Sequence, residues 1–196
     1  MKDETNLDHR KKKIDGEKSA ISFSAVRNYA LDFRKHFLSF FDKCADGSGK
    51  VLNWARLNTD DRKTHLKKVF RHLIAFKGIR RDIKLEFAGA AKKGALGSAT
   101  AGKVKLYDQL LDSSDYNIAA EVLAHEVGHV FQMNDAQTTL SRETVETSAA
   151  NYVQPAEDYE YYRKNPMEAE AFEIGKVVGE DFTAALRRRA LDSRAA

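Results

Sequence analysis

The segment 113–133, SSDYNIAAEVLAHEVGHVFQM, constrains the fold of this chain more than any other stretch. Ser114 or Asp115 is placed to cap a helix that starts at about residue 117. Four apolar residues then recur at the spacing of one helix face: Ala119, Leu123, Val127 and Val130. Because such a face needs an apolar partner, we expect this helix to be packed against the core of the protein.

The rest of this helix carries His125 and His129, with Glu126 directly after the first histidine. Four residues give about 40° of net rotation, so the two imidazoles share a face one turn apart and can bind one metal ion. Glu126 is close to that face, where it can serve as general base for a water that the metal activates. Gly128 costs about 1 kcal/mol of helix stability relative to alanine, which favours close packing there. The alternative is an HExxH that arose by chance.

The HEVGH of residues 125–129 resembles the zincin metallopeptidases, in which the two histidines bind zinc and the glutamate is the base. The resemblance extends from about residue 83 to about residue 180. It implies a Zn²⁺ cofactor and the hydrolysis of peptide bonds. It also implies that a peptide substrate lies extended along the strand around KVKLYD, residues 103–108, as along the edge of a sheet.

A third zinc ligand has to be found, because a catalytic zinc needs three protein ligands and one open position. Asp135 lies six residues after His129, where the metzincin pattern HExxHxxGxxH/D has its last ligand. That pattern turns the chain at a glycine, and this sequence has Gln132 in its place. All six histidines occur at or before position 129, so no later histidine is available.

Glu168 is the other candidate, since gluzincins take their third ligand from a glutamate on a later helix. Asn165 and Pro166 are typical of a helix start. On this helix Glu168 falls beside small residues that let another helix approach: Ala171, Gly175 and Gly179. Glu170 and Glu173 are expected on its charged side, and the choice of third ligand among Glu168, Glu170 and Asp135 stays open. The alternative role for Glu168 is a capping box with Asn165.

A second resemblance concerns Tyr161, which lies seven residues before Glu168. The lethal-factor-type toxin metallopeptidases have a tyrosine at this distance, and its hydroxyl helps to stabilise the oxyanion. Tyr159 and Tyr162 could take this role instead, and all of them could simply be packing residues. Compact zincins of this kind resemble effector or toxin domains, which is the cellular role that the resemblance implies.

The remaining chain predicts an α+β fold. Residues 21–41 and the stretch from Asn58 or Thr59 to residue 76 have apolar residues at helical spacing. Residues 82–90 and 103–111 are typical of strands that pair as a hairpin across a glycine-rich connection. For residues 134–164 we expect a short helix and a loop. His65 and His72 have no ligand spacing, so we expect them to be surface or packing residues.

Composition limits the class of protein. Hydrophobic residues make up 42% and charged residues 32% of the 196 residues, as in globular proteins. The net charge of +4 comes without a nucleic-acid-binding motif, and no apolar run is long enough for a membrane span. Cys44 is the single cysteine, so no intramolecular disulfide forms. The N-terminal residues lack the apolar stretch of a secretory signal, so we expect a cytoplasmic protein or one exported without such a signal.

We therefore predict a mostly helical single domain with a small antiparallel sheet. It comprises a charged, disordered leader (1–20), a helical part (21–80) and a zincin-like core (81–196). The predicted function is a zinc-dependent metallopeptidase acting on protein or peptide substrates, with His125, His129 and Glu168 as ligands and Glu126 and Tyr161 as catalytic residues. The alternatives are a basic helical binding module with a structural zinc or none, and a metallohydrolase acting on a non-peptide bond. The sequence does not indicate the substrate or the oligomeric state.

Overall fold

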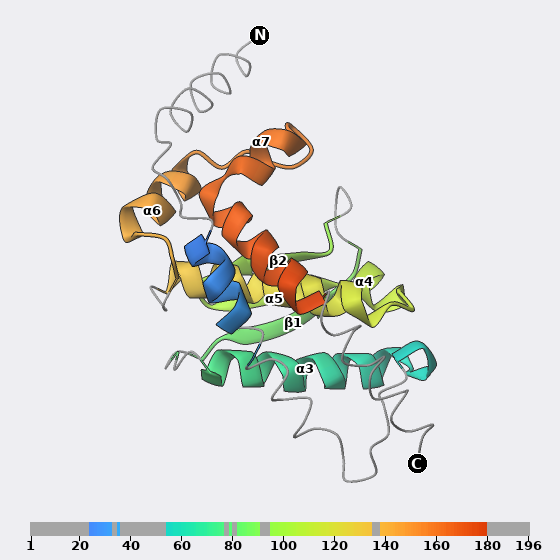
Figure 1. Cartoon of the computed structure of the whole chain (residues 1–196). Helices are drawn as coiled ribbons and strands as arrows, with labels where there is room; N and C mark the ends of the chain where they lie inside the picture. The colour runs from blue at the N-terminus through green and yellow to red at the C-terminus, as the bar shows by residue number, and fades with distance from the viewer. Residues whose placement is uncertain are drawn as a thin grey trace.

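Three short strands form a mixed sheet beside two long helices (Figure 1). The computed structural model describes residues 24–32, 35, 54–76, 79, 82–90, 95–134 and 138–179. The strands are β1 (Lys84–Ala88), β2 (Gly97–Thr100) and β3 (Lys103–Tyr107). Their order in the sheet is β1-β3-β2. The architecture is the predicted α+β single domain with mostly helical content.

The pairing of the strands differs from the prediction. β1 runs parallel to β3, whereas β2 is antiparallel to it. The predicted hairpin between β1 and β3 is therefore wrong, and the sheet is mixed rather than antiparallel. The reason is that the glycine-rich connection supplies β2, which pairs with β3 around the tight turn at Ala101 and Gly102. The chain thus crosses to the far edge of the sheet before it returns as the central strand.

The position of β3 also corrects the prediction that KVKLYD is an edge strand. β3 is paired on both sides, so its backbone cannot accept an extended peptide. The edge next to the HExxH helix is β2, which contacts that helix. Val104 and Leu106 of β3 are fully buried, and they anchor the sheet in the core.

Two long helices pack on one face of the sheet: α3 (Thr59–Phe76) beside β1, and α5 (Tyr116–Met133) beside β2 and β3. Both begin at the predicted caps. The Asn58 side chain accepts a hydrogen bond from the backbone N–H of Asp61 at 2.9 Å, and that of Asp115 accepts from Asn117 at 2.9 Å. The short elements η1 (Trp54–Arg56) and α4 (Asp108–Asp112) precede these two helices.

The segment between α5 and the last described helix forms two helices, where the sequence predicted one. They are α6 (Arg142–Ala150) and α7 (Tyr159–Lys164). Ser141 caps α6 and Asp158 caps α7, each through its side-chain oxygen. They lead into a helix over residues 166–179, which crosses α5 in Figure 1.

Glycines allow that crossing to be close, as the sequence predicted. A Cβ added to Gly175 would lie 2.9 Å from the backbone oxygen of Glu121. On the α5 side, a Cβ on Gly128 would lie 3.1 Å from Cδ1 of Ile174. The helix 166–179 is therefore held against the face of α5 that carries the histidines.

In the N-terminal part, the helix of residues 24–32 buries Val26 and Ala30. The predicted leader, 1–20, lies outside the described residues. Of the predicted helix 21–41, only residues 24–32 and 35 are described. His65 packs between α3 and α5, with its Nε2 2.9 Å from the Tyr116 hydroxyl and its ring against Trp54. This confirms it as a packing residue.

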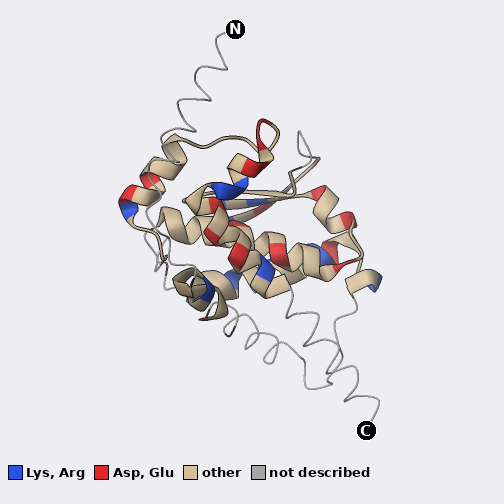
Figure 2. Cartoon of the chain, turned by 45° about the horizontal axis from the view of Figure 1, so that its top comes forward, with Lys and Arg blue, Asp and Glu red and all other residues tan. Residues whose placement is uncertain are grey.

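Charged residues of both signs are interspersed over the described helices and strands (Figure 2). Two ion pairs illustrate this: Lys103–Glu86 at 3.2 Å and Arg142–Glu146 at 2.9 Å. Among the described residues, no helix is both long and apolar enough to cross a membrane.

Candidate metal centre

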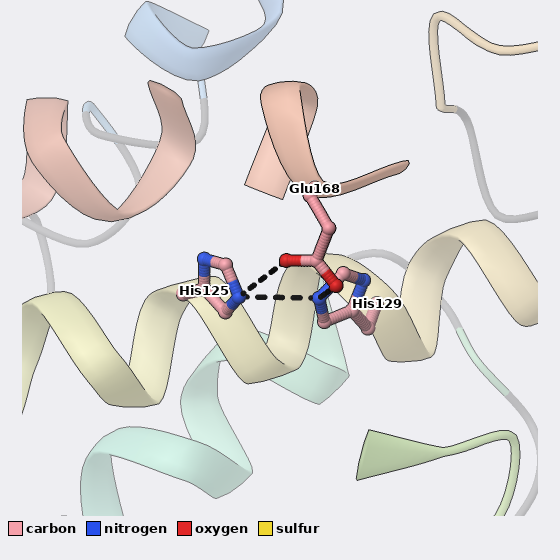
Figure 3. A group of neighbouring side chains, drawn as sticks. All are labelled: His125, His129 and Glu168. Carbon is pink, nitrogen blue, oxygen red and sulfur yellow. Dashed lines mark hydrogen bonds and ion pairs between the residues drawn. The ribbon is translucent and has the colours of Figure 1, made fainter. Parts of the chain in front are cut away.

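The two histidines of α5 point to the same place. The Nε2 atoms of His125 and His129 lie 3.2 Å apart, and both side chains are buried. They are one turn apart on the same side of the helix, as Figure 3 shows. Ala124, Val127 and Val130 on α5 are fully buried in the hydrophobic core, which fixes the rotation of the helix about its axis.

Glu168 reaches the same point from the first turn of the helix 166–179 (Figure 3). Its Oε2 lies 3.3 Å from Nε2 of His125, and its Oε1 lies 3.4 Å from Nε2 of His129. The capping-box alternative is not formed, because the backbone N–H of Asn165 donates to the carbonyl of Tyr162 at 3.1 Å. Asn165 still caps the helix by accepting from the backbone N–H of Met167 at 3.0 Å.

The spacing of these donor atoms fits a zinc ion. Two zinc bonds of about 2.0–2.1 Å at a tetrahedral angle place their donor atoms about 3.3–3.4 Å apart. The three measured separations are 3.2, 3.3 and 3.4 Å. In addition, the buried Oε2 of Glu168 has its 3.3 Å ion pair with His125 but no well-aligned hydrogen bond among the described residues, and a cation would satisfy it. His125, His129 and Glu168 thus form a group of donor atoms that could hold a metal ion.

The charges of the three groups are strongly coupled. Although burial acts to raise it, the pKa of Glu168 is held well below its usual range by hydrogen bonds and charge from both histidines. Burial acts to lower the pKa of His129, but Glu168 outweighs it and raises that pKa to about 9. Burial lowers the pKa of His125. Binding of a metal requires the nitrogen of each histidine that faces the site to be unprotonated, so metal binding and proton binding compete at this site.

Glu126 lies against the edge strand of the sheet. A Cβ on Gly97 of β2 would lie only 2.6 Å from Oε1 of Glu126, so the carboxylate occupies space that only a glycine leaves. The side chain is 7% exposed. Burial raises the pKa of Glu126 to about 7, with an opposing effect from His129 and a further increase from Glu168.

A cleft of about 440 Å³ opens onto His125 and Glu126. β2 and the residues before it form one wall, where Leu96 and Gly97 lie. The rest of the lining comes from α5, the segment 154–156, α7 and the helix 166–179, and it includes Val122, Tyr162 and Phe172. The lining is mostly apolar around the two site residues.

The tyrosines of α7 take different positions. Tyr161 is buried, 8% exposed, and is not among the residues that line the cleft. Tyr159 and Tyr162 do line it. Burial and the charge of Glu168 raise the pKa of both Tyr152 and Tyr162, which places these two hydroxyls within electrostatic reach of the site.

Two further residues border the site and were not predicted. Gln132 accepts a hydrogen bond from Nδ1 of His129 at 2.9 Å and donates to Glu170 at 2.8 Å. The expectation that Glu170 lies on a charged, outward side is wrong, because it is only 1% exposed. The spacing His129–Gln132, three residues on a helix, was the signal available in the sequence.

Asp135, the alternative third ligand, lies outside the described residues.

A comparison with protein families agrees with this chemistry. A model of Peptidase family M48 matches residues 60–156, slightly less than half of the chain. The matched residues include His125, Glu126 and His129 but end before Glu168. The match supports a hydrolase of the zinc metallopeptidase class, which acts on peptide bonds. No curated protein and no solved structure matched the chain.

Proposed function

We propose that this protein is a zinc-dependent peptidase in which His125, His129 and Glu168 hold the metal. The spacing of the three donor atoms, 3.2–3.4 Å, is the observation that carries the proposal. A bound zinc supplies Lewis-acid polarisation of the scissile carbonyl and activates water. Three donors leave one coordination position for chemistry, as in a gluzincin.

Glu126 is proposed as the general base. Glu126 lines the cleft directly beside His125, which is where a general base for a metal-bound water has to lie. It takes a proton from the attacking water and donates it to the leaving amine. Because Gly97 has no side chain, this carboxylate can lie close to the edge strand. The base is then next to the strand along which the peptide is proposed to bind.

The peptide is proposed to add to β2 as an extended strand. β2 is an edge of the sheet, and its first residue, Gly97, lines the cleft beside Glu126. Backbone groups of an edge strand can pair with an incoming peptide. Because Leu96, Val122 and Phe172 line the same cleft, we expect an apolar side chain next to the scissile bond.

A tyrosine is proposed to support the oxyanion. The sequence-based assignment of Tyr161 remains a prediction, and the lethal-factor-type resemblance on which it rests lies beyond the residues matched to the peptidase family. The position of Tyr162 in the lining of the cleft favours this neighbour instead. A phenolic hydroxyl that faces the cleft can donate to developing negative charge on the carbonyl oxygen.

The proposal is tested with Glu126→Gln, which keeps the size of the side chain. Zinc-loaded wild-type protein is expected to cleave members of a peptide mixture with apolar residues, and the variant to lose at least about 100-fold in turnover. Zinc content should be equal in both. Turnover at the wild-type rate in the variant, or no cleavage by zinc-loaded wild-type protein, would contradict the proposal.

The effector or toxin role is part of the same proposal. If the peptidase acts on host proteins, expression of the wild-type chain should arrest cell growth, and Glu126→Gln should not. Equal growth of both strains would argue against this role without affecting the peptidase chemistry.

A binding module with a structural zinc is the alternative. Structural zinc sites are closed by four protein ligands, whereas the described residues bring three together beside an open cleft. This alternative predicts zinc binding without turnover of any peptide.

A further inference from the structure

Gln132 and Glu170 are each 1% exposed, and neither lines the cleft. Gln132 lies one turn after His129 on α5. Glu170 lies two residues after Glu168 on the helix 166–179. Burying a polar amide and a carboxylate together is costly unless all their groups find partners. Neither residue takes part in the proton transfers of the proposed reaction, so their burial must have another cause.

The orientation of the Gln132 amide is fixed by its neighbours. Its Nε2 donates to the carbonyl oxygen of Met167 at 2.9 Å and to Oε2 of Glu170 at 2.8 Å. Both partners are oxygen acceptors, and an amide nitrogen has two N–H groups to offer them. The amide oxygen must therefore be the atom that faces Nδ1 of His129, 2.9 Å away.

This orientation decides which nitrogen of His129 faces the metal site. An amide oxygen can only accept, so Nδ1 of His129 has to carry the proton. Nε2 is then the nitrogen that points to His125 and Glu168, at 3.2 and 3.4 Å. Hydrogen bonding at one ring nitrogen sets both the tautomer and the direction of the ring in metal-binding histidines.

Glu170 is in turn held by groups outside the two helices that carry the ligands. Its Oε1 accepts from the backbone N–H of Thr139 at 2.8 Å and from the Thr139 hydroxyl. Its Oε2 accepts from the Thr138 hydroxyl at 2.7 Å as well as from Gln132. With these donors on both oxygens, the carboxylate has little freedom to turn, and it keeps the Gln132 amide in place.

We infer that Gln132 and Glu170 are positioning residues of the metal site, which act through His129. In the relay His129–Gln132–Glu170, the imidazole is held with Nε2 toward the metal. Its Nδ1–H donates to the Gln132 amide oxygen, and the amide nitrogen of Gln132 donates to the buried Glu170 carboxylate. This inference rests on the proposed function, since it assumes that His129 binds a metal. The competing explanation is that Gln132 and Glu170 only tie α5, the helix 166–179 and residues 138–139 together.

The two explanations are separated by Gln132→Met and a matched control, Thr138→Val. Methionine keeps the length of the side chain but cannot accept from His129. Thr138→Val removes a hydrogen bond to Glu170 at the other end of the network and leaves the contact with His129 intact. For each full-length variant, zinc affinity is measured by competition with a chelator, and the thermal stability of the metal-free protein is measured separately. The Nδ1–H signal of His129 in the zinc-loaded protein is followed by NMR.

The relay predicts that Gln132→Met weakens zinc binding about 10- to 100-fold and that its Nδ1–H signal loses protection from exchange. Thr138→Val should stay within about threefold of the wild-type affinity and keep the protected signal. If both variants lose stability alike but bind zinc equally well, the relay is only structural and the inference is wrong. An unchanged Nδ1–H signal in Gln132→Met would also overturn it.

If Gln132→Met does not fold, Glu170→Gln decides the question. It keeps an oxygen to accept from Gln132 but removes the charge, so zinc affinity should fall about three- to tenfold below that of the wild-type protein. Wild-type affinity in Glu170→Gln would overturn the inference. If the wild-type protein binds zinc tightly and Glu170→Gln binds it equally well, only the relay is refuted. If the wild-type protein binds no zinc, the proposed function is refuted.

Discussion

At the scale of single residues, the position of Glu126 depends on the residue opposite it. Gly97 leaves room for the carboxylate at the edge of the sheet, where a Cβ would come within 2.6 Å of Oε1. Proton transfer needs the base within hydrogen-bond reach of the attacking water, and a displacement of about 1 Å costs up to about 100-fold in rate. A glycine that looked like part of a loop in the sequence is thus part of the site.

Gly97→Ala is therefore expected to lower the turnover of peptides by about 10- to 100-fold while zinc binding is retained. The added methyl group pushes Glu126 away but touches no ligand. Gly102→Ala is the matched control, because a Cβ there meets no atom within 4 Å. Steady-state kinetics and metal analysis on both variants check this. Equal turnover in Gly97→Ala and wild-type protein would show that the close contact is unimportant.

Tyr161 and Tyr162 are expected to differ in their effect on catalysis. Tyr162→Phe should lower the turnover number about 100-fold, because Tyr162 lines the cleft and phenylalanine has no hydroxyl to donate to the oxyanion. Tyr161→Phe should change turnover much less, since this side chain is buried away from the cleft lining. Kinetics on the two single variants give the answer, and the reverse order of effects would restore Tyr161 to the catalytic role.

At the scale of elements, local signals predicted the helices well and the sheet less well. The caps Asn58, Asp115 and Asn165 act within a few residues, so the sequence reveals where these helices begin. The pairing of β1 with β3 depends on where the connection between them goes, and that connection forms β2 itself. Glu170 was misplaced for a similar reason: helix periodicity does not show that residues 138–139 cover this side of the helix.

The contact between α3 and α5 provides a pH-dependent test. Burial, with the nearby charge of Lys68, lowers the pKa of His65 to about 4. In the unfolded chain, the pKa of His65 is about 6.5. As the pH falls, His65 is therefore protonated in the unfolded chain before it is protonated in the folded protein. Stability contributed by neutral His65 is present above about pH 6.5 and is lost as the pH falls toward 4. His65→Gln, which does not titrate, should lose less stability over this range than the wild-type protein.

Thermal unfolding of both proteins at several pH values between 7 and 4 measures this. The remaining titrating groups are common to the two proteins, so their effects cancel in the difference. Curves that run parallel over this range would mean that His65 titrates normally in the folded protein.

At the scale of the whole molecule, the proposed ligands come from two helices, and His129 and Glu168 are 39 residues apart in the sequence (168 − 129). The sequence predicted the pair on α5 from its spacing, and it predicted Glu168 from resemblance and from the small residues beside it. The close crossing at Gly128 and Gly175 is what brings the two helices together. The family match covers α3 to the end of the cleft-lining segment 154–156, so the helix with Glu168 is the part that the match leaves out.

Whether His125, His129 and Glu168 together hold one zinc ion is decided by the zinc content of the purified protein. After loading and dialysis, wild-type protein should contain about one zinc per chain. Glu168→Ala should contain far less, and Glu173→Ala, a control on the same helix, should match the wild type. If folded wild-type protein contains no zinc after loading, or if Glu168→Ala retains a full equivalent, these three residues do not form the zinc site.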